Sequence, residues 1–326
     1  MSLLEVRDLR VRLPTEAGTA YILNGIDLEV ERGGRLGIVG ESGCGKSMTA
    51  LAIMGLLPDQ AMVEGAVCLD GLDLLALDEP ALCRIRGRRI GMIFQEPMTA
   101  LNPVMAIGAQ IAEGPRRQLG LSRADAEARV LRLMERVGLP PARFSPRLYP
   151  HQLSGGQRQR VGIAIALASE PEILIADEPT TALDVTIQAQ VLRLLDEIVA
   201  EAGMGLVLVT HDLGVIAGMT DRMLVMYAGF VVESGPTAEV FAAMAHPYTA
   251  GLFRALPPEV GGVVTRAPLA TIPGQVPSPL VPPRACPFVE RCWQAQDICH
   301  REMAPLREVG PGHRAACHFP LAGAPA

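Results

Sequence analysis

One eight-residue stretch, Gly40 to Ser47, restricts the fold of this chain more than any other part of the sequence. It reads Gly-Glu-Ser-Gly-Cys-Gly-Lys-Ser and lies between an apolar run at 36–39 and a second one at 48–54. These runs predict a strand before it and a helix after it, the context in which G-x-x-x-x-G-K-S forms a phosphate-binding loop. A glycine-rich turn with a solvated lysine is the alternative, but it does not need the full spacing. We therefore expect an α/β fold that binds a nucleoside triphosphate.

The residue types of this stretch suit contact with phosphate. Glycines leave backbone N–H groups free to converge on phosphate oxygens at a helix N-terminus. We expect the Lys46 ammonium to contact the β- and γ-phosphates and the Ser47 hydroxyl to ligate Mg²⁺. The residues expected to bind the nucleotide here are Gly40, Ser42, Gly43, Cys44, Gly45, Lys46, Ser47 and Met48.

Three further apolar runs each end in polar residues that fit the same chemistry. Gln95 follows the first run, Asp177 and Glu178 the second, and His211 the third. Because ligands of open α/β sheets bind at the carboxyl ends of the strands, we expect these side chains to share one crevice. Taken singly, they could be an ordinary loop glutamine, an acidic surface turn and a structural histidine.

Within that crevice the side chains are expected to do different things. Successive residues leave a strand on opposite sides, so Asp177 can face Mg²⁺ through water while Glu178 points towards the γ-phosphate. Gln95 is a candidate sensor of Mg²⁺ and of the attacking water, and His211 is a candidate contact of the γ-phosphate.

A second glycine-containing helix start lies at Leu153-Ser154-Gly155-Gly156-Gln157. Ser154 is a good N-cap, and an apolar-faced helix follows as far as residue 168. A helix whose first turn carries few side chains is an anion site. A serine-capped helix start without a ligand is the alternative interpretation.

The remaining pattern predicts the surrounding layers. Residues 3–13 and 22–30 alternate apolar and polar side chains, which predicts an antiparallel layer beside the nucleotide-binding core. Tyr21 lies in this layer, either stacking on an adenine ring or simply half-buried on its strand. Residues 106–149 are expected to be largely helical, and a stripe of core residues is predicted at Val130, Leu131, Met134 and Val137. The run Gly138-Leu139-Pro140-Pro141 predicts the end of that helix.

Composition argues against several other classes of protein. The chain has 326 residues, a formal net charge of −6 and 49% hydrophobic residues. It should therefore be globular, and it lacks the basic excess that is usual for nucleic-acid binding. No apolar run approaches the roughly 18–20 residues of a membrane span, and the N-terminus lacks a signal-peptide pattern. We expect a cytosolic protein that reaches a membrane only through a partner.

The order and spacing of the motifs resemble those of an ABC-transporter ATPase subunit. In that family they correspond to the Walker A, Q-loop, signature, Walker B, D-loop and H-loop motifs, here Gly40 to Ser47, Gln95, Leu153 to Gln157, Ile173 to Glu178, Ala182 to Asp184 and His211. Longer strings, such as those at 94–103, 149–154 and 246–249, are similar to the D-type ATP-binding subunit of bacterial oligopeptide/dipeptide importers.

The resemblance implies a mechanism. Two such domains pair head to tail, and each nucleotide lies between the Walker A loop of one and the signature loop of the other. Ser154, Gly156, Gln157 and Asp184 would then bind nucleotide at the interface. The implied catalytic residues are Glu178 as general base, with Lys46, Gln95 and His211. The Mg²⁺ contacts are Ser47 and Gln95, and Asp177 is counted among the nucleotide-binding residues.

The chain after residue 256 changes character. We expect an ABC ATPase domain at 1–256, with a helical subdomain at about 97–160, and an irregular extension at 257–326 that holds 13 of the 27 prolines. Its cysteines have the spacing C-x5-C-x6-C-x17-C and are Cys286, Cys292, Cys299 and Cys317. Zinc sites usually use closer pairs, whereas iron–sulfur clusters accept looser spacing. The resemblance ranks a 4Fe-4S cluster first, zinc second and free thiols last.

The resemblance also implies partners and a location. These are a second ABC ATPase subunit, a related chain in preference to a second copy, two transmembrane permease subunits and an extracytoplasmic substrate-binding protein. The protein would lie peripherally on the cytoplasmic face of the bacterial inner membrane. Dipeptide, oligopeptide, glutathione and nickel-chelate cargo are not ranked. The alternative function is a soluble ABC-type ATPase acting on nucleic acid or ribosomes with a zinc-binding tail, but the single ATPase domain and the acid excess disfavour it.

Overall fold

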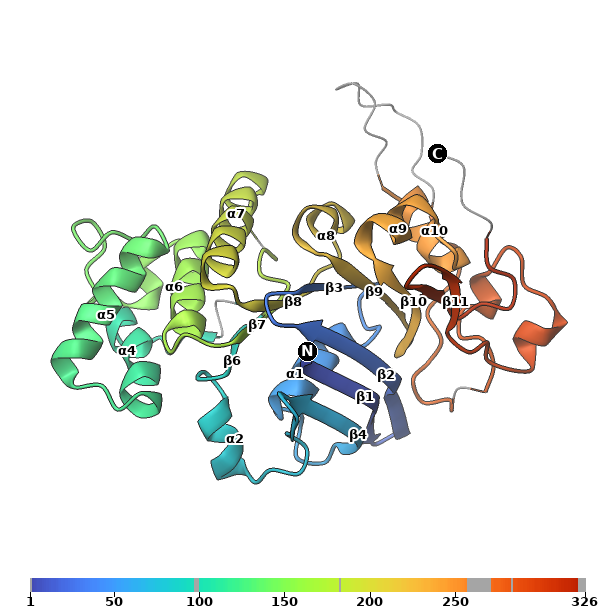
Figure 1. Cartoon of the computed structure of the whole chain (residues 1–326), viewed down its shortest axis with the longest axis horizontal. Helices are drawn as coiled ribbons and strands as arrows, with labels where there is room; N and C mark the ends of the chain where they lie inside the picture. The colour runs from blue at the N-terminus through green and yellow to red at the C-terminus, as the bar shows by residue number, and fades with distance from the viewer. Residues whose placement is uncertain (1, 97–99, 182, 257–270, 283, 322–326) are drawn as a thin grey trace, which may run out of the picture.

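Two β-sheets with helices on their faces make up most of the structure, which is a computed structural model (Figure 1). It describes residues 2–96, 100–181, 183–256, 271–282 and 284–321.

Five parallel strands form the centre of the larger sheet. They are β3 (Arg35–Val39), β6 (Ile90–Ile93), β7 (Ile173–Asp177), β8 (Gly205–Val209) and β9 (Arg222–Tyr227). They lie in the order β9-β3-β8-β7-β6. Every residue of β6, β7 and β8 is buried, which explains why these strands are unbroken apolar runs in the sequence. The strand ends that carry the predicted polar residues therefore lie along one edge.

A four-stranded antiparallel sheet covers one face of this centre, as the alternating sequence pattern predicts. Its order is β2 (Gly18–Glu31), β1 (Ser2–Thr15), β4 (Met62–Leu69) and β5 (Leu72–Asp73). The helix α1 (Lys46–Met54) lies between the two sheets (Figure 1). Buried residues of all three layers, among them Ile26, Ile53 and Ile175, form one hydrophobic cluster. This packing holds α1 against the sheet.

The opposite face of the larger sheet is covered by further helices (Figure 1). These are α7 (Val185–Ala202), α8 (Leu213–Met219), α9 (Thr237–Ala242) and α10 (Pro247–Arg254). Val191, Leu195 and Ile198 of α7 are buried, and belong to the second hydrophobic cluster. None of the helices in the described ranges is long and apolar enough to cross a membrane.

A helical region forms one end of the molecule. It contains α4 (Ile107–Gln118), α5 (Arg123–Arg136), the 3-10 turn η1 (Pro150–Gln152) and α6 (Gly155–Leu167). α5 ends where the sequence predicts a helix end at Gly138-Leu139-Pro140-Pro141, and Gly138 has φ of +73°. The expectation of helix is wrong for residues 142–149, which lie in turns and irregular backbone. Leu131 is also wrongly placed in the core stripe: it is 43% exposed, and Leu133 is buried instead.

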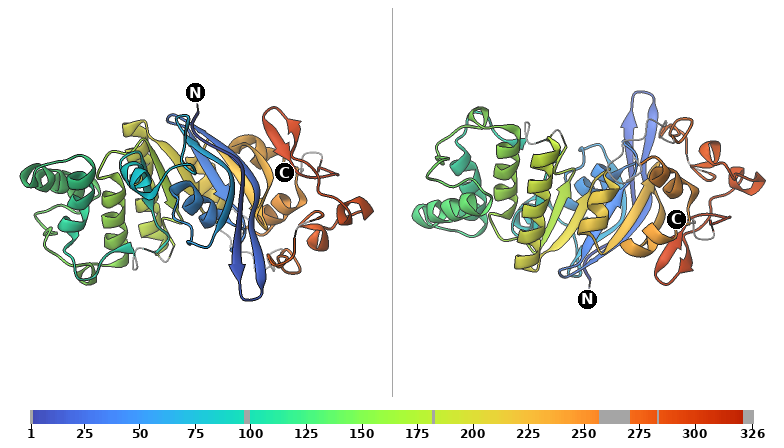
Figure 2. Two further views of the ribbon diagram at one scale, coloured as in Figure 1. Left: turned by 90° about the horizontal axis from the view of Figure 1, so that it is seen from below. Right: turned by 90° about the horizontal axis from the view of Figure 1, so that it is seen from above.

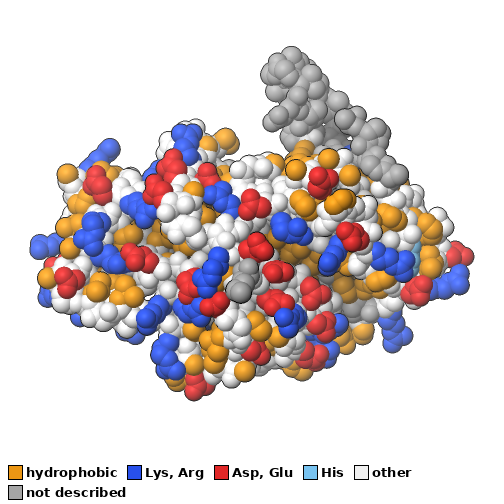
Figure 3. Space-filling model, viewed as in Figure 1, with side chains coloured by type: hydrophobic (Ala, Val, Ile, Leu, Met, Phe, Trp, Pro, Cys, Tyr) orange, Lys and Arg blue, Asp and Glu red, His pale blue; other side chains and the backbone are white. Residues whose placement is uncertain are grey.

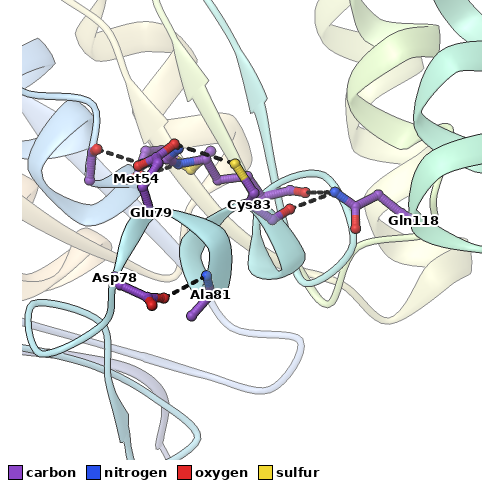
Figure 4. A network of polar contacts seen from close by, with 8 residues as sticks. Met54, Asp78, Glu79, Ala81, Cys83 and Gln118 are labelled. Carbon is purple, nitrogen blue, oxygen red and sulfur yellow. Dashed lines mark hydrogen bonds and ion pairs between the residues drawn. The ribbon is translucent and has the colours of Figure 1, made fainter.

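A polar network ties this helical region to the centre (Figure 4). The helix α2 (Glu79–Ile85) ends beside Arg86, whose guanidinium donates to the carbonyl oxygens of Met54 at 2.8 Å and Gly55 at 2.6 Å. The Gln118 amide of α4 donates to the carbonyl oxygens of Cys83 at 2.6 Å and Arg86 at 3.0 Å. The end of α1 is thereby linked to α4 through α2.

The C-terminal part extends the larger sheet instead of forming a wholly irregular tail. After β10 (Phe230–Pro236) come the 3-10 turns η2 (Val289–Arg291) and η3 (Asp297–His300) and the strands β11 (Arg307–Gly310) and β12 (His313–Ala315). β12 pairs with both β10 and β11. These strands are too short to show an alternating pattern in sequence. Figure 2 shows this part at the opposite end of the molecule from α4 and α5.

The domain boundaries expected from the sequence fall at segments that the structure does not describe. The expected junction at 256/257 borders segment 257–270, and the expected start of the helical subdomain at residue 97 begins segment 97–99; both segments lie outside the described residues.

Candidate functional site

The loop Gly40 to Ser47 joins β3 to α1 with a backbone that only glycine can follow. Gly40 has φ of +153° and Gly45 φ of +105°. A Cβ added at Gly40 would lie 2.2 Å from the Met226 carbonyl oxygen. Gly45 is the N-cap of α1, and no side chain of the described chain caps this helix start. Its first N–H groups are therefore available to an anion.

Lys46 lies across this loop. Its side chain is buried, and its ammonium donates to the carbonyl oxygens of Gly40 at 2.9 Å and Glu41 at 3.1 Å. Lys46 is the only lysine of the sequence; the other 28 basic residues are arginines. An ammonium is a compact point charge that the planar fork of arginine does not reproduce. This difference explains why lysine and not arginine occupies this position.

Two oxygen-bearing side chains that suit Mg²⁺ lie side by side next to the loop. The Ser47 hydroxyl donates to the Asp177 carboxylate at 3.0 Å. Asp177 ends β7 and is buried, and burial raises its pKa above the ordinary value while the Ser47 hydrogen bond opposes that rise. A hydroxyl and a carboxylate are ligands that Mg²⁺ prefers, so the donor set fits this ion.

The ends of β6, β7 and β8 converge on Glu178. Its carboxylate accepts a hydrogen bond from the Gln95 amide at 3.2 Å, and the His211 Nδ1 lies 3.5 Å from the same oxygen. The hydroxyl of Thr181 donates to the same oxygen at 2.7 Å, a contact that was not predicted from the sequence. Its position three residues after Glu178, in a tight turn, could have indicated this contact. Glu178 itself has φ of +45°, an uncommon backbone for a non-glycine residue.

The helix start at Ser154 is not part of this convergence within the chain. Ser154 caps α6, and Gln157 completes the capping box by accepting from the Ser154 N–H at 2.8 Å. A Cβ at Gly156 would lie 2.6 Å from Ile187 of α7, so glycine permits close helix packing there. Between described residues, no hydrogen bond joins 154–157 to 40–47.

Two other predicted nucleotide contacts have local partners. Asp184 caps α7 by accepting from the Ile187 N–H at 3.0 Å, and Ala182, the first residue of that predicted motif, lies outside the described residues. Tyr21 is half-buried on β2, with the Arg12 guanidinium 5.8 Å from its ring centroid. Its backbone N–H donates to the Pro279 carbonyl at 2.7 Å. Adenine stacking by Tyr21 stays a prediction.

The four C-terminal cysteines line one cavity, together with His246, Phe288 and His318. Burial raises the pKa of Cys286 to about 11 and also raises the pKa values of Cys292 and Cys317. Across the described ranges, no three His, Cys, Asp or Glu side chains are grouped closely enough to hold one metal ion. Of the neighbouring histidines, His313 points elsewhere and contacts the buried Glu233 at 2.7 Å.

Comparison with known proteins agrees with this arrangement. The ABC transporter family model matches residues 23–181, and the model "Oligopeptide/dipeptide transporter, C-terminal region" matches residues 232–299. The oligopeptide transport ATP-binding protein OppD of Salmonella typhimurium is 46% identical over 320 residues, 98% of this chain and 94% of that protein. The dipeptide transport ATP-binding protein DppD of Lactococcus lactis is 48% identical over 312 residues, 95% of this chain and 88% of that protein.

A solved structure shares the fold of the cassette. The ATP-binding cassette MJ0796, in a dimeric post-hydrolysis state bound to ADP and Pi, has a TM-score of 0.65 and 30% identity, covering 72% of this chain and 98% of that one. Because the relatives are 46–48% identical over nearly the whole chain and both family regions match, the protein belongs to the oligopeptide/dipeptide family of ABC-transporter ATP-binding proteins.

Proposed function

We propose that this chain binds and hydrolyses ATP as a subunit of an ABC importer that powers peptide uptake through permease subunits. The observation that carries the catalytic part is the convergence of three strand ends on Glu178, beside the Ser47 and Asp177 pair. The names of the relatives, which are oligopeptide and dipeptide transport proteins, support peptides as the cargo.

The residues of the site can carry hydrolysis as follows. The loop N–H groups and Lys46 would bind the β- and γ-phosphates. Ser47 and Gln95, with Asp177 through water, would hold Mg²⁺, which would neutralise charge on the phosphate oxygens. Glu178 takes a proton from the attacking water at its carboxylate. Gln95 and His211, both within reach of that carboxylate, orient the water and the γ-phosphate.

The N-terminus of α6, at Ser154 to Gln157, supplies its anion site to another chain. Residues 154–157 lie apart from the loop of their own chain, and the similar MJ0796 cassette is described as a dimer. We infer a head-to-tail pair, formed with a related chain, on the cytoplasmic face of the inner membrane with two permeases and an extracytoplasmic binding protein. The cassette at 1–256 would contact the permeases near Gln95 and the helical subdomain at about 97–160.

Co-purification tests this assignment against a nucleic-acid or ribosome function. We expect the tagged chain to be recovered from detergent-solubilised membranes with two polytopic membrane proteins and a second ATPase. The face in Figure 3 shows Lys and Arg interspersed with Asp and Glu, so retention on nucleic acid at physiological salt is not expected. Such retention without membrane partners would contradict the transport function.

We further propose that residues 257–326 form an extension that holds a 4Fe-4S cluster. Cys286, Cys292, Cys299 and Cys317 line the same cavity, yet no three of them are grouped for a single ion. A cluster of four irons holds its thiolates farther apart than zinc, whose bonds to sulfur are about 2.3 Å. The spacing of the four cysteines in the sequence, which is looser than the close pairs of usual zinc sites, favours the cluster over zinc.

The expected result is a brown anaerobic preparation that contains iron and loses its broad visible absorbance when Cys292 is replaced by serine. Cys83→Ser is the matched control, because Cys83 lies on α2, away from the cavity. A colourless preparation containing zinc would decide for the zinc site.

A further inference from the structure

The C-terminal extension reaches directly into the phosphate loop. Arg291, in the turn η2, pairs with both carboxylate oxygens of Glu41, at 2.7 and 3.0 Å. Glu41 is the second residue of the loop, 250 positions earlier in the chain. The Arg291 side chain is only 5% exposed. The Glu41 side chain is 26% exposed, so this is a two-pronged ion pair between a buried guanidinium and a partly buried carboxylate, the geometry in which arginine is most selective.

The Arg291 guanidinium is fixed on every side. It donates to the carbonyl oxygens of Pro273 at 3.0 Å and Ile272 at 3.2 Å and to the Tyr227 hydroxyl at 3.3 Å. Its centre lies 5.6 Å from the Tyr227 ring and 5.9 Å from the Phe288 ring. The extension therefore presents the charge to Glu41 in one defined place.

Glu41 is also held through its backbone, and this backbone supports Lys46. The Glu41 N–H donates to the Tyr248 hydroxyl at 2.8 Å, and its carbonyl oxygen accepts from Lys46 Nζ at 3.1 Å. Tyr248 and Tyr227 pack together at 4.6 Å between ring centroids, and Phe288 of the extension packs on both. A shift of Glu41 would consequently move an acceptor of the phosphate-binding lysine.

We propose that Arg291 is a positioning residue of the nucleotide site, which makes ATP affinity depend on the C-terminal extension by fixing Glu41 and the loop. A buried ion pair is weak evidence for stability alone, because desolvation offsets the attraction. Because Glu41 lies within the phosphate loop, the pair with Arg291 can position the loop in addition to any effect on stability. The Tyr21 N–H bond to Pro279 shows the extension beside the loop's neighbouring strand as well. The inference rests on the assignment of Gly40 to Ser47 as the phosphate loop.

The test is a double-mutant cycle with MgATP, using Glu41→Gln, Arg291→Met and the two combined in the full chain. Each single variant should raise the Kd for ATP about tenfold at a temperature well below its Tm. The combined variant should be no worse than either single one, because both remove the same contact. Turnover at saturating ATP should fall much less than affinity. Arg291→Lys should bind ATP more tightly than Arg291→Met but more weakly than the unaltered chain, because lysine lacks the planar guanidinium that contacts both Glu41 oxygens.

The matched control is His313→Ala, which removes another buried contact between the extension and the cassette, the one to Glu233, without touching the loop. It should lower Tm and leave the Kd for ATP unchanged. Equal loss of affinity in His313→Ala, or normal affinity in the Glu41 and Arg291 variants, would overturn the proposal. Normal affinity in the Glu41 and Arg291 variants would leave the phosphate-loop assignment intact, provided that the unaltered chain binds ATP and Lys46→Ala does not.

Discussion

Replacing Glu178 with glutamine should reduce steady-state ATP hydrolysis to a small residue while ATP binding persists. The amide has the shape of the carboxylate, so the contacts with Gln95 at 3.2 Å and Thr181 at 2.7 Å can be largely retained, but it cannot accept a proton from water. General-base catalysis contributes about 10²- to 10⁴-fold, and turnover should fall by that factor. Phosphate release and equilibrium nucleotide binding, measured on the same preparation, check both halves of the expectation.

A matched control lies at the other end of the same strand. Glu172 immediately precedes β7 and accepts hydrogen bonds from Arg32 and Arg89. Glu172→Gln removes an acid from the neighbourhood of β7 without reaching the strand ends that meet at Glu178, and it should leave turnover near normal. Unimpaired hydrolysis in Glu178→Gln would remove Glu178 from the role of base.

Replacing Lys46 should have its largest effect on affinity. Hydrogen bonds to charged groups contribute about 1.5–3 kcal/mol each, so Lys46→Ala should raise the Kd for ATP about 10- to 100-fold. Lys46→Arg should fail to restore it, because the buried position beside Gly40 and Glu41 fits a compact ammonium and not a planar fork. Fluorescent-nucleotide titration measures both variants.

The control for this second prediction is Arg89→Met. Arg89 is another basic side chain close to the sheet, but it pairs with Glu172 and Asp70 and does not contact the loop. We expect its ATP affinity to match that of the unaltered chain. Unchanged ATP binding by Lys46→Ala would refute the assignment of Gly40 to Ser47.

Much of the site could be predicted from sequence because its information is local. The glycine spacing of the loop and the polar residues at strand ends each lie within a few positions of an apolar run, and parallel strands bring such ends together. The antiparallel layer was predictable for the same reason, since β1 and β2 alternate over long stretches.

The parts that sequence reasoning missed depend on contacts between distant positions. Nothing near Glu41 or Arg291 indicates that they pair across 250 positions, because each alone is an ordinary charged residue. The strands β11 and β12 are defined only by pairing with β10. Leu131 was wrongly predicted to be buried, because an apolar residue on a helix can lie at the edge of the buried face. Leu133 is the residue that packs inside.

The central claim is that each ATP lies between two chains. One chain contributes its phosphate loop, and the other contributes the helix start that corresponds to Ser154 to Gln157. The most direct measurement is a structure of the Glu178→Gln assembly trapped with MgATP. The account predicts Ser154 and Gly156 of this chain within hydrogen-bond distance of the γ-phosphate of a nucleotide held on the phosphate loop of its neighbour. A closed, nucleotide-bound assembly in which residues 154–157 face solvent, far from any triphosphate, would contradict it.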